Sequence, residues 1–299
     1  MADPVKDHSV SENIPLGISL SIGEVIFTVI IAAFVKFISN DTSVFVILFY
    51  RYLFCLPLLL ITATVQRGRA ALLILNKGKL ALRSLFGLAS FGFLFAALEK
   101  IELSKMTALL QTIPIFVTLL APILIGERVG WRRRSAVLVG FVGVYLIISP
   151  SGTGWYNLGT LFGMLSPFFG ALMLITLRSL GQTDHPATTA VWYNASGAVV
   201  FLIFCMLLDV RWPSSEVVVL VMISIGVMSS FQQFCLANSY RMAPASLLAP
   251  LRYLSVPAGV GISIVFFNEH ITSTFYLGAI IIIAASLFIL KRTEKQKRS

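Results

Sequence analysis

The chain has 299 residues, of which 57% are apolar and only 12% carry a charge. Soluble domains average about 45–50% apolar and about 25% charged residues, and a soluble globule of this length could not hide the excess while keeping its surface charged. The composition therefore excludes a soluble enzyme, a disordered chain and a secreted disulfide scaffold. Because the apolar runs are continuous, whereas the strands of a membrane barrel alternate, we expect an all-α polytopic membrane protein.

The formal net charge is +10, from 23 Lys and Arg against 13 Asp and Glu. No basic patch with interleaved aromatic residues stands outside the apolar runs, so we expect no nucleic-acid partner. The excess is better explained as loop charge that orients membrane spans. The three cysteines, Cys55, Cys205 and Cys235, lie inside apolar runs without a spaced pair or a Cys/His cluster, so neither a disulfide framework nor a zinc site is expected.

Ten apolar runs follow one another along the chain, and each is close to the roughly 20 residues that a spanning helix needs. They cover residues 15–37, 43–64, 80–98, 104–126, 132–149, 157–178, 187–208, 215–237, 244–267 and 272–290. The connections are short, so no soluble domain fits between them. Residues 1–13 lack the basic start and the cleavage site of a signal peptide. We therefore expect a polar N-terminal tail over 1–13, a retained first span and a basic C-terminal tail over 291–299.

The distribution of Lys and Arg predicts the orientation of the spans. With the N-terminus placed in the cytoplasm, the inner ends and loops hold 17 of these residues, Arg83 among them, and the outer ends hold four. The outer four are Lys36, Lys100, Lys105 and Arg211. Since Lys and Arg concentrate in cytoplasmic loops, we expect both termini to be cytoplasmic.

The two halves of the chain resemble each other at a constant shift in numbering, which equals 142 and which we call the repeat shift. The matches are Leu16-Gly17 with Leu158-Gly159, Lys36 with Arg178, Tyr50 with Trp192 and Glu127 with Glu269. A further match of Ala108-Leu109-Leu110 with Ser246-Leu247-Leu248 needs a shift of 138. Because five spans are an odd number, the second half inserts upside down relative to the first, as in secondary transporters built from inverted repeats. We expect two such repeats, over 14–150 and 151–290.

Three local features carry a resemblance to a known family. Glutamates close the fourth and ninth spans, in Leu124-Ile125-Gly126-Glu127 and Phe266-Phe267-Asn268-Glu269, and the second span holds Phe49-Tyr50-Arg51. With ten spans arranged as five plus five, the chain resembles the drug/metabolite transporter superfamily, and within it the bacterial EamA-type exporters. The resemblance implies a helical bundle around a central cavity, alternating access without ATP, and a place in the bacterial inner membrane. Many members that resemble this chain export amino acids, aromatic ones included, and others move nucleosides, nucleotide sugars, sugar phosphates or drugs.

Ionisable residues inside the spans are the sharpest local signal, because each costs about 2.5–3.5 kcal/mol to insert unless it is paired or faces water. Three qualify: Glu24 near the middle of the first span, Arg51 in the second and Arg252 in the ninth. An arginine could hold a substrate carboxylate through two hydrogen bonds, while Glu24 meets an ammonium group or carries a proton. Alternatively, Glu24 pairs with Arg51 or Arg252 and only fastens helices together.

Polar residues at helical spacing indicate a wet face. Ser21 shares a stripe with Glu24, Gln232 and Gln233 are adjacent in the eighth span, Gln111 lies in the fourth, and Tyr253 follows Arg252. Interhelical hydrogen bonding is the alternative explanation, at about 0.6 kcal/mol per pair. Phe91 and Phe95 of the third span could line an apolar pocket, or they could face lipid or fill the core. These residues complete the predicted substrate site: Ser21, Glu24, Phe91, Phe95, Gln111, Gln232, Gln233, Arg252 and Tyr253.

Pro114 in the fourth span and Pro257 in the ninth lie at comparable depth in the two repeats. A proline inside a helix frees the carbonyl four residues earlier, and such backbone is tolerated in a membrane only where protein or a wet cavity satisfies it. We expect these two prolines to act as hinges, the alternative being static kinks.

We conclude from the sequence that the chain is a secondary transporter that exports small metabolites, with amino acids as the expected substrates and a lipid bilayer around it. No phosphate-binding Gly-x-x-x-x-Gly-Lys loop occurs and no nucleophile–base pair or metal cluster lies in a span, so we expect neither an ATP-driven pump nor an enzyme, and no cofactor or metal. We expect a monomer or a weak homodimer. A channel or a receptor-like scaffold is the alternative from another class.

Overall fold

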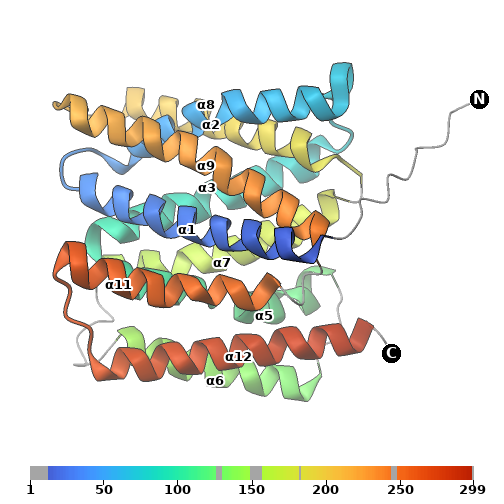
Figure 1. Cartoon of the computed structure of the whole chain (residues 1–299), viewed down its shortest axis with the longest axis vertical. Helices are drawn as coiled ribbons and strands as arrows, with labels where there is room; N and C mark the ends of the chain where they lie inside the picture. Colours follow the sequence, from blue (N-terminus) through green and yellow to red (C-terminus); the bar gives the residue numbers. More distant parts are fainter. Residues whose placement is uncertain (1–12, 126–129, 149–156, 182, 244–247, 298–299) are drawn as a thin grey trace, which may run out of the picture.

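The computed structural model describes residues 13–125, 130–148, 157–181, 183–243 and 248–297, and within these ranges the regular structure is entirely helical. The long helices are α1 (Ile14–Ile38), α2 (Val44–Arg67), α3 (Lys77–Lys100), α6 (Trp131–Ile148), α7 (Leu158–Leu180), α8 (Pro186–Leu207), α9 (Glu216–Met242) and α12 (Ser273–Lys297). The shorter elements are η1 (Gly68–Ala70), α4 (Leu103–Leu110), α5 (Ile113–Ile125), η3 (Ala249–Leu254) and α11 (Ser255–Phe267). The helices lie nearly parallel in a single bundle (Figure 1).

The prediction of an all-α membrane protein with ten spans is confirmed. Within the described residues, seven helical segments are long and apolar enough to cross a membrane, and three shorter apolar segments cover 134–148, 251–267 and 273–289. The start of α1 and the end of α12 lie at the same end of the bundle (Figure 1), as an even number of crossings requires. Large apolar side chains such as Val65, Leu207 and Val265 are exposed, which suits a surface that faces lipid.

Two of the ten predicted spans are broken, which the sequence interpretation did not include. The run 104–126 folds as two helices, α4 and α5. Between them the N–H groups of Gln111 and Thr112 donate to carbonyls three residues earlier, which is the tighter hydrogen-bond pattern of a 3₁₀ turn. The run 244–267 is described as η3 followed by α11, with a tight helix of the 3₁₀ type before Ser255. Since Pro114 and Pro257 each lie in the first turn of the second segment, where no intrahelical N–H bond is needed, they permit the breaks.

The helices of the two halves follow the repeat shift. Segments α5 and α11 both begin and end at this shift, α1 and α7 end at it, and α2 and α8 begin at it. The predicted local slip to 138 involves Ser246 and Leu247, which lie outside the described residues. After the stretch in which the slip was predicted, the repeat shift again relates the helices, beginning with α5 and α11.

The helix contacts are those of two oppositely oriented repeats related by a pseudo-twofold axis. If each helix is exchanged for its counterpart, the extensive pair α3–α7 becomes α9–α1 and the pair α5–α7 becomes α11–α1, whereas α2–α8 and α6–α12 map onto themselves. Close backbone approaches obey the same relation. A Cβ on Gly17 would lie 2.6 Å from Cβ of Ala243, and one on Gly159 would lie 2.8 Å from a side-chain atom of Ile101. Because Ala243 and Ile101 are themselves related by the repeat shift, the repeat is a property of the packing as well as of the sequence.

Candidate functional site

Glu24 and Gln232 are brought together across the seam between α1 and α9, as the sequence interpretation expected. Glu24 is only 3% exposed. The Thr28 hydroxyl donates a hydrogen bond of 3.1 Å to Glu24 Oε1, and Gln232 Nε2 donates one of 2.8 Å to Thr28 Oγ1. Ser21, one turn earlier on α1, is buried as well. The result is a polar chain that links a buried carboxyl of the first repeat to an amide of the second.

Within the part of the chain that the structure describes, Arg51 forms no ion pair with Glu24. Within the described residues the ion pairs are Lys36–Glu269, Lys100–Glu99 and Lys105–Glu102, and Glu24 belongs to none of them. A buried carboxyl in a membrane interior is costly. The predicted role of Glu24, to meet a substrate cation or to carry a proton, stays a prediction.

Gln233 faces a different neighbour from Gln232. Its Nε2 atom lies 3.2 Å from Cys55 Sγ on α2. The two adjacent amides therefore tie α9 to two helices of the first repeat, α1 and α2. This agrees with the expectation that two neighbouring amides do not face one partner, and the part of Gln233 in the substrate site stays a prediction.

Gln111 and Tyr253 occupy corresponding positions at the two helix breaks, since the repeat shift relates one to the other. Gln111 Nε2 donates to Ser255 Oγ at 2.8 Å, and the Ser286 hydroxyl donates to the Gln111 carbonyl at 2.9 Å. Tyr253 is buried beside them in η3. The polar backbone at the breaks thus finds partners on the opposite repeat, which satisfies the condition for irregular backbone at membrane depth.

Arg252 lies in η3 next to this cluster. It is partly buried, and its carbonyl accepts a hydrogen bond of 2.9 Å from Ser255 Oγ. The role expected for Arg252, holding a substrate carboxylate, stays a prediction.

Arg51 is buried among aromatic rings. It is 1% exposed, and its guanidinium carbon lies 4.0 Å from the ring centre of Phe91, 4.8 Å from that of Tyr52 and 6.0 Å from that of Phe95. Phe91 and Phe95 therefore cover a cation instead of forming a purely apolar pocket. Phe95 is 1% exposed and Phe91 packs against the same core cluster, so the two rings fill the core, as one of the sequence interpretations had it, while their contact with Arg51 was not predicted.

Arg83 is the residue that the sequence interpretation missed, because it was counted among the charges of the cytoplasmic end. It is 7% exposed, and its guanidinium carbon lies 4.2 Å from the ring centre of Tyr193 on α8. The signal was present in the sequence, since Arg83 falls inside the predicted span 80–98.

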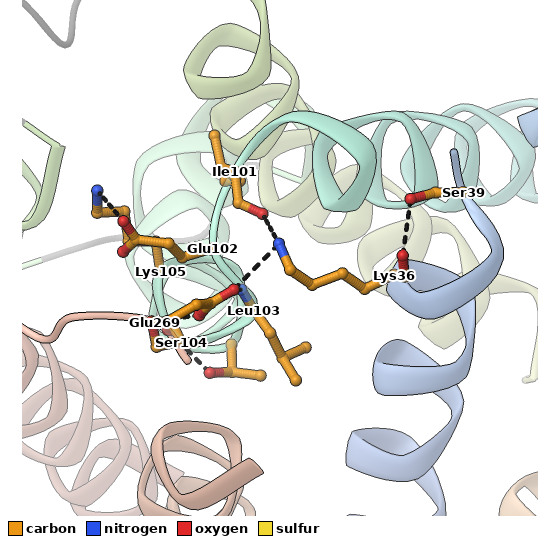
Figure 2. Close-up of polar contacts among 9 residues, drawn as sticks. Lys36, Ser39, Ile101, Glu102, Leu103, Ser104, Lys105 and Glu269 are labelled. Carbon is orange, nitrogen blue, oxygen red and sulfur yellow. Dashed lines mark hydrogen bonds and ion pairs between the residues drawn. The ribbon is translucent and has the colours of Figure 1, made fainter. Parts of the chain in front are cut away.

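A charged network closes the end of the bundle at which α1 and α3 finish (Figure 2). Lys36 Nζ lies 3.1 Å from Glu269 Oε1 and donates to the Ile101 carbonyl at 2.7 Å. The Glu269 carboxylate also accepts hydrogen bonds from the Leu103 N–H at 3.1 Å and the Ser104 hydroxyl at 3.3 Å. The network thus fastens the loop after α11, in the second repeat, to two segments of the first, α1 and the start of α4.

The carboxyl of Glu269 lies in the loop beyond the end of α11. Burial on its own raises the pKa of Glu269, but the neighbouring Ser263 hydroxyl, the Lys36 ammonium and the Leu103 N–H together hold that pKa below its ordinary value. The carboxylate is therefore charged at neutral pH and available for the ion pair.

The opposite end of the bundle is different. Arg178, the counterpart of Lys36 in the second repeat, is exposed. Glu127, the counterpart of Glu269, lies outside the described residues. The Lys36–Glu269 pair thus joins the two repeats at one end, whereas Arg178, at the corresponding position of the other end, is exposed.

The same two halves match a known family. Residues 15–149 and 157–291 each match the EamA-like transporter family. The chain belongs to the EamA-like transporter family. The resemblance to the drug/metabolite transporter superfamily is thereby confirmed, and the chain is a multi-pass membrane transporter of small molecules.

Relatives of this family member carry several different names. A riboflavin transporter of Vibrio cholerae is 30% identical over 69% of this chain and 68% of its own length. An S-adenosylmethionine uptake transporter of Rickettsia prowazekii is 26% identical over 88% of both chains, and a pseudopaline exporter of Pseudomonas aeruginosa is 26% identical over 79% of this chain and 83% of its own. A solved structure covers 94% of this chain with a TM-score of 0.63 at 14% identity, which supports the fold alone.

The hinge role of Pro114 and Pro257 has a structural setting but remains a prediction. Both stand at helix breaks beside Gln111 and Tyr253, where a change of backbone angle disturbs few helical hydrogen bonds. Within the described residues, no group of three or more His, Cys, Asp or Glu side chains could hold a metal ion.

Proposed function

We propose that the chain is a secondary transporter that exports small metabolites, amino acids first among them, across the bacterial cytoplasmic membrane by alternating access. The observation that carries the proposal is that two equivalent cations differ at the two ends of the bundle. Lys36 is paired with Glu269 at one end, whereas its counterpart Arg178 is exposed at the other. A carrier of two inverted repeats needs such an asymmetry, because exchanging the two arrangements moves access from one side to the other.

The site of this carrier lies where the two repeats meet. Glu24 and Gln232 are joined through Thr28, and Gln111 contacts Ser255 at the helix breaks. We propose that Glu24 receives the substrate's ammonium group or exchanges a proton for it. Rocking at the breaks next to Pro114 and Pro257 would then open and close the path.

The orientation follows from the Lys and Arg distribution. With both termini in the cytoplasm, the end closed by Lys36 and Glu269 faces the periplasm, and this conformation is closed to that side. We propose the repeat boundaries 14–150 and 151–290 with tails over 1–13 and 291–299, and a monomer or weak homodimer as the functional unit. The lipid bilayer and the small molecule are the partners, and no enzyme activity is proposed.

Counterflow in proteoliposomes tests the proposal. Vesicles loaded with an unlabelled amino acid should accumulate the same labelled amino acid from outside, in a saturable manner. The panel should also include riboflavin, nucleosides and organic phosphates, because named relatives move other metabolites. Flux that does not saturate and is not stimulated by internal substrate would instead indicate a channel.

Glu24→Gln separates the two roles proposed for the carboxyl. The substitution keeps the size and the contact with Thr28 but removes the titratable proton. If Glu24 carries a proton, counterflow by the variant should no longer depend on pH, although the exchange of labelled for unlabelled substrate should persist. Unchanged uptake together with an unchanged pH profile would show that Glu24 is structural.

A further inference from the structure

Two arginines are buried in the membrane interior with unsatisfied hydrogen-bond donors. Nε and Nη1 of both Arg51 and Arg83 are sealed from solvent and have no hydrogen-bond partner. These two atoms carry three of the five N–H donors of each guanidinium. An unpaired buried charge is among the most costly features in a protein interior, so the pair requires an explanation.

The arginines flank one tyrosine pair. The Tyr52 and Tyr193 hydroxyls lie 2.9 Å apart, and their rings meet edge to face at 5.5 Å between centres. Arg51 lies over the Tyr52 ring and Arg83 over the Tyr193 ring. Since the two hydroxyls share one hydrogen bond, one O–H is left as a further donor. The cluster presents donors from α2, α3 and α8.

Glycines on the neighbouring helices make room for this cluster. A Cβ on Gly197 would lie 2.6 Å from Cγ of Tyr52, and one on Gly87 would lie 2.7 Å from Cε2 of Tyr193. Each tyrosine ring therefore packs directly against the backbone of a helix. The donors are fixed by this packing before any ligand arrives, which is what a preorganised site requires.

The charge of the cluster is not balanced by the protein. No ion pair within the described residues involves either arginine, and the aromatic rings supply cation–π attraction but accept no conventional hydrogen bond. Two guanidinium groups thus leave an excess of two positive charges. Carboxylate and phosphate oxygens match the planar fork of a guanidinium, and either group would supply both the charge and the missing acceptors.

We propose that the transported substrate is a small organic anion whose carboxylate or phosphate group binds to Arg51 and Arg83 beside Tyr52 and Tyr193. The inference rests on the proposed transport function and narrows its substrate class. Among amino acids it selects the acidic ones, because a neutral amino acid brings an ammonium group along with its single carboxylate. Phe91 covers the guanidinium of Arg51 at 4.0 Å and would shield the bound group from water.

Thermal unfolding of the purified protein tests the anion site without transport. The probes are L-glutamate, its neutral counterpart L-glutamine, and inorganic phosphate, all at fixed ionic strength. L-glutamate or phosphate at about 100 times its Kd should raise the Tm by about 5 °C, and L-glutamine should not. Arg51→Met and Arg83→Met should abolish the rise while keeping or raising the Tm without ligand, because each removes an unpaired buried charge.

Arg69→Met is the matched control, because Arg69 is exposed after α2 and loses the same charge. It should keep the full response to L-glutamate or phosphate. A response to neither anion in the wild type, or an equal response in both buried variants, would overturn the proposal. A large fall of Tm in both buried variants, with the anion response intact, would show that the arginines serve packing alone.

Counterflow distinguishes this inference from the proposed function. Exchange of acidic substrates should fall at least tenfold in Arg51→Met. If the wild type exchanges neutral substrates and Arg51→Met does so equally well, the chain is a transporter but the anion site is wrong. If no compound shows counterflow, the transport function itself fails, and the thermal arm still decides whether the arginines bind anions.

Discussion

Loss of the charge on Glu269 should open the end of the bundle that Lys36 now closes. The substitution Glu269→Gln keeps the shape and an oxygen for the Leu103 N–H, so that the ion pair with Lys36 is the main loss. The Lys36 and Glu269 side chains are 18% and 7% exposed, which places the pair between surface pairs worth about 0–1 kcal/mol and buried pairs that cost about 3–5 kcal/mol to break. We expect about 2 kcal/mol, which corresponds to roughly 30-fold in the ratio of open to closed molecules.

Thiol labelling measures that ratio. Leu103 is fully buried at the closed end, so Leu103→Cys in a background without Cys55, Cys205 and Cys235 should react only when the end opens. A membrane-impermeant maleimide added outside should label the Glu269→Gln variant about 30-fold faster than its parent, as long as opening and closing are fast relative to labelling.

Glu99→Gln is the control for this experiment. Glu99 pairs with Lys100 at 3.6 Å at the same end, and the two side chains are 29% and 37% exposed, so its loss should change the labelling rate little. Equal rates for Glu269→Gln and its parent would refute the assignment of the Lys36–Glu269 pair as a closure. If Glu99→Gln accelerated labelling as much as Glu269→Gln does, the cause would be the loss of any negative charge at this end and not the loss of the Lys36–Glu269 pair.

Two further outcomes follow from the structure. Because the folded-state pKa of Glu269 is lowered, the stabilisation that its charge gives to the ion pair is complete above the ordinary carboxyl pKa of 4.5. This stabilisation is lost as the pH falls through the lowered pKa. The labelling rate of Leu103→Cys, divided at each pH by that of an exposed cysteine to remove the titration of the thiol itself, should be flat at neutral pH and rise only at acid pH, and a rise of this ratio near pH 7 would contradict the argument. Gly197→Ala places a methyl group 2.6 Å from Tyr52 Cγ and should cost about 1–3 kcal/mol, seen as a lower Tm, whereas Gly92→Ala, whose nearest contact is at 4.0 Å, should cost less; equal Tm values would contradict the packing argument.

Much of the fold could be predicted because the bilayer restricts the solutions. A run of apolar residues of membrane length has no stable option but a helix, and five such runs per repeat invert the second copy. The matches of Lys36 with Arg178 and of Gly17 with Gly159 mark the repeat shift that the helix ends obey. The breaks between α4 and α5 and between η3 and α11 were harder to predict, since proline permits either a kink or a break.

The site was predicted only in part, because a sequence names polar residues but not their neighbours. Glu24 and Gln232 meet across the seam, while Gln233 turns to Cys55, and nothing in the spacing of two adjacent glutamines decides between α1 and α2. Arg83 was assigned to the loop charges because it stands close to a helix end, although its side chain is buried. Long side chains of this kind can snorkel to water or turn inward, and only the packing decides.

Reciprocal motion of the two ends tests the account most directly. Spin labels at Phe37→Cys and Phe266→Cys report on the end closed by Lys36, and labels at Ser179→Cys and Leu124→Cys, which the repeat shift relates to the first two positions, report on the other. On addition of a transported substrate, or in Glu269→Gln, the first distance should lengthen in the same molecules in which the second shortens. Two distances that lengthen together, or that never change, would contradict a carrier that alternates between two mirrored arrangements.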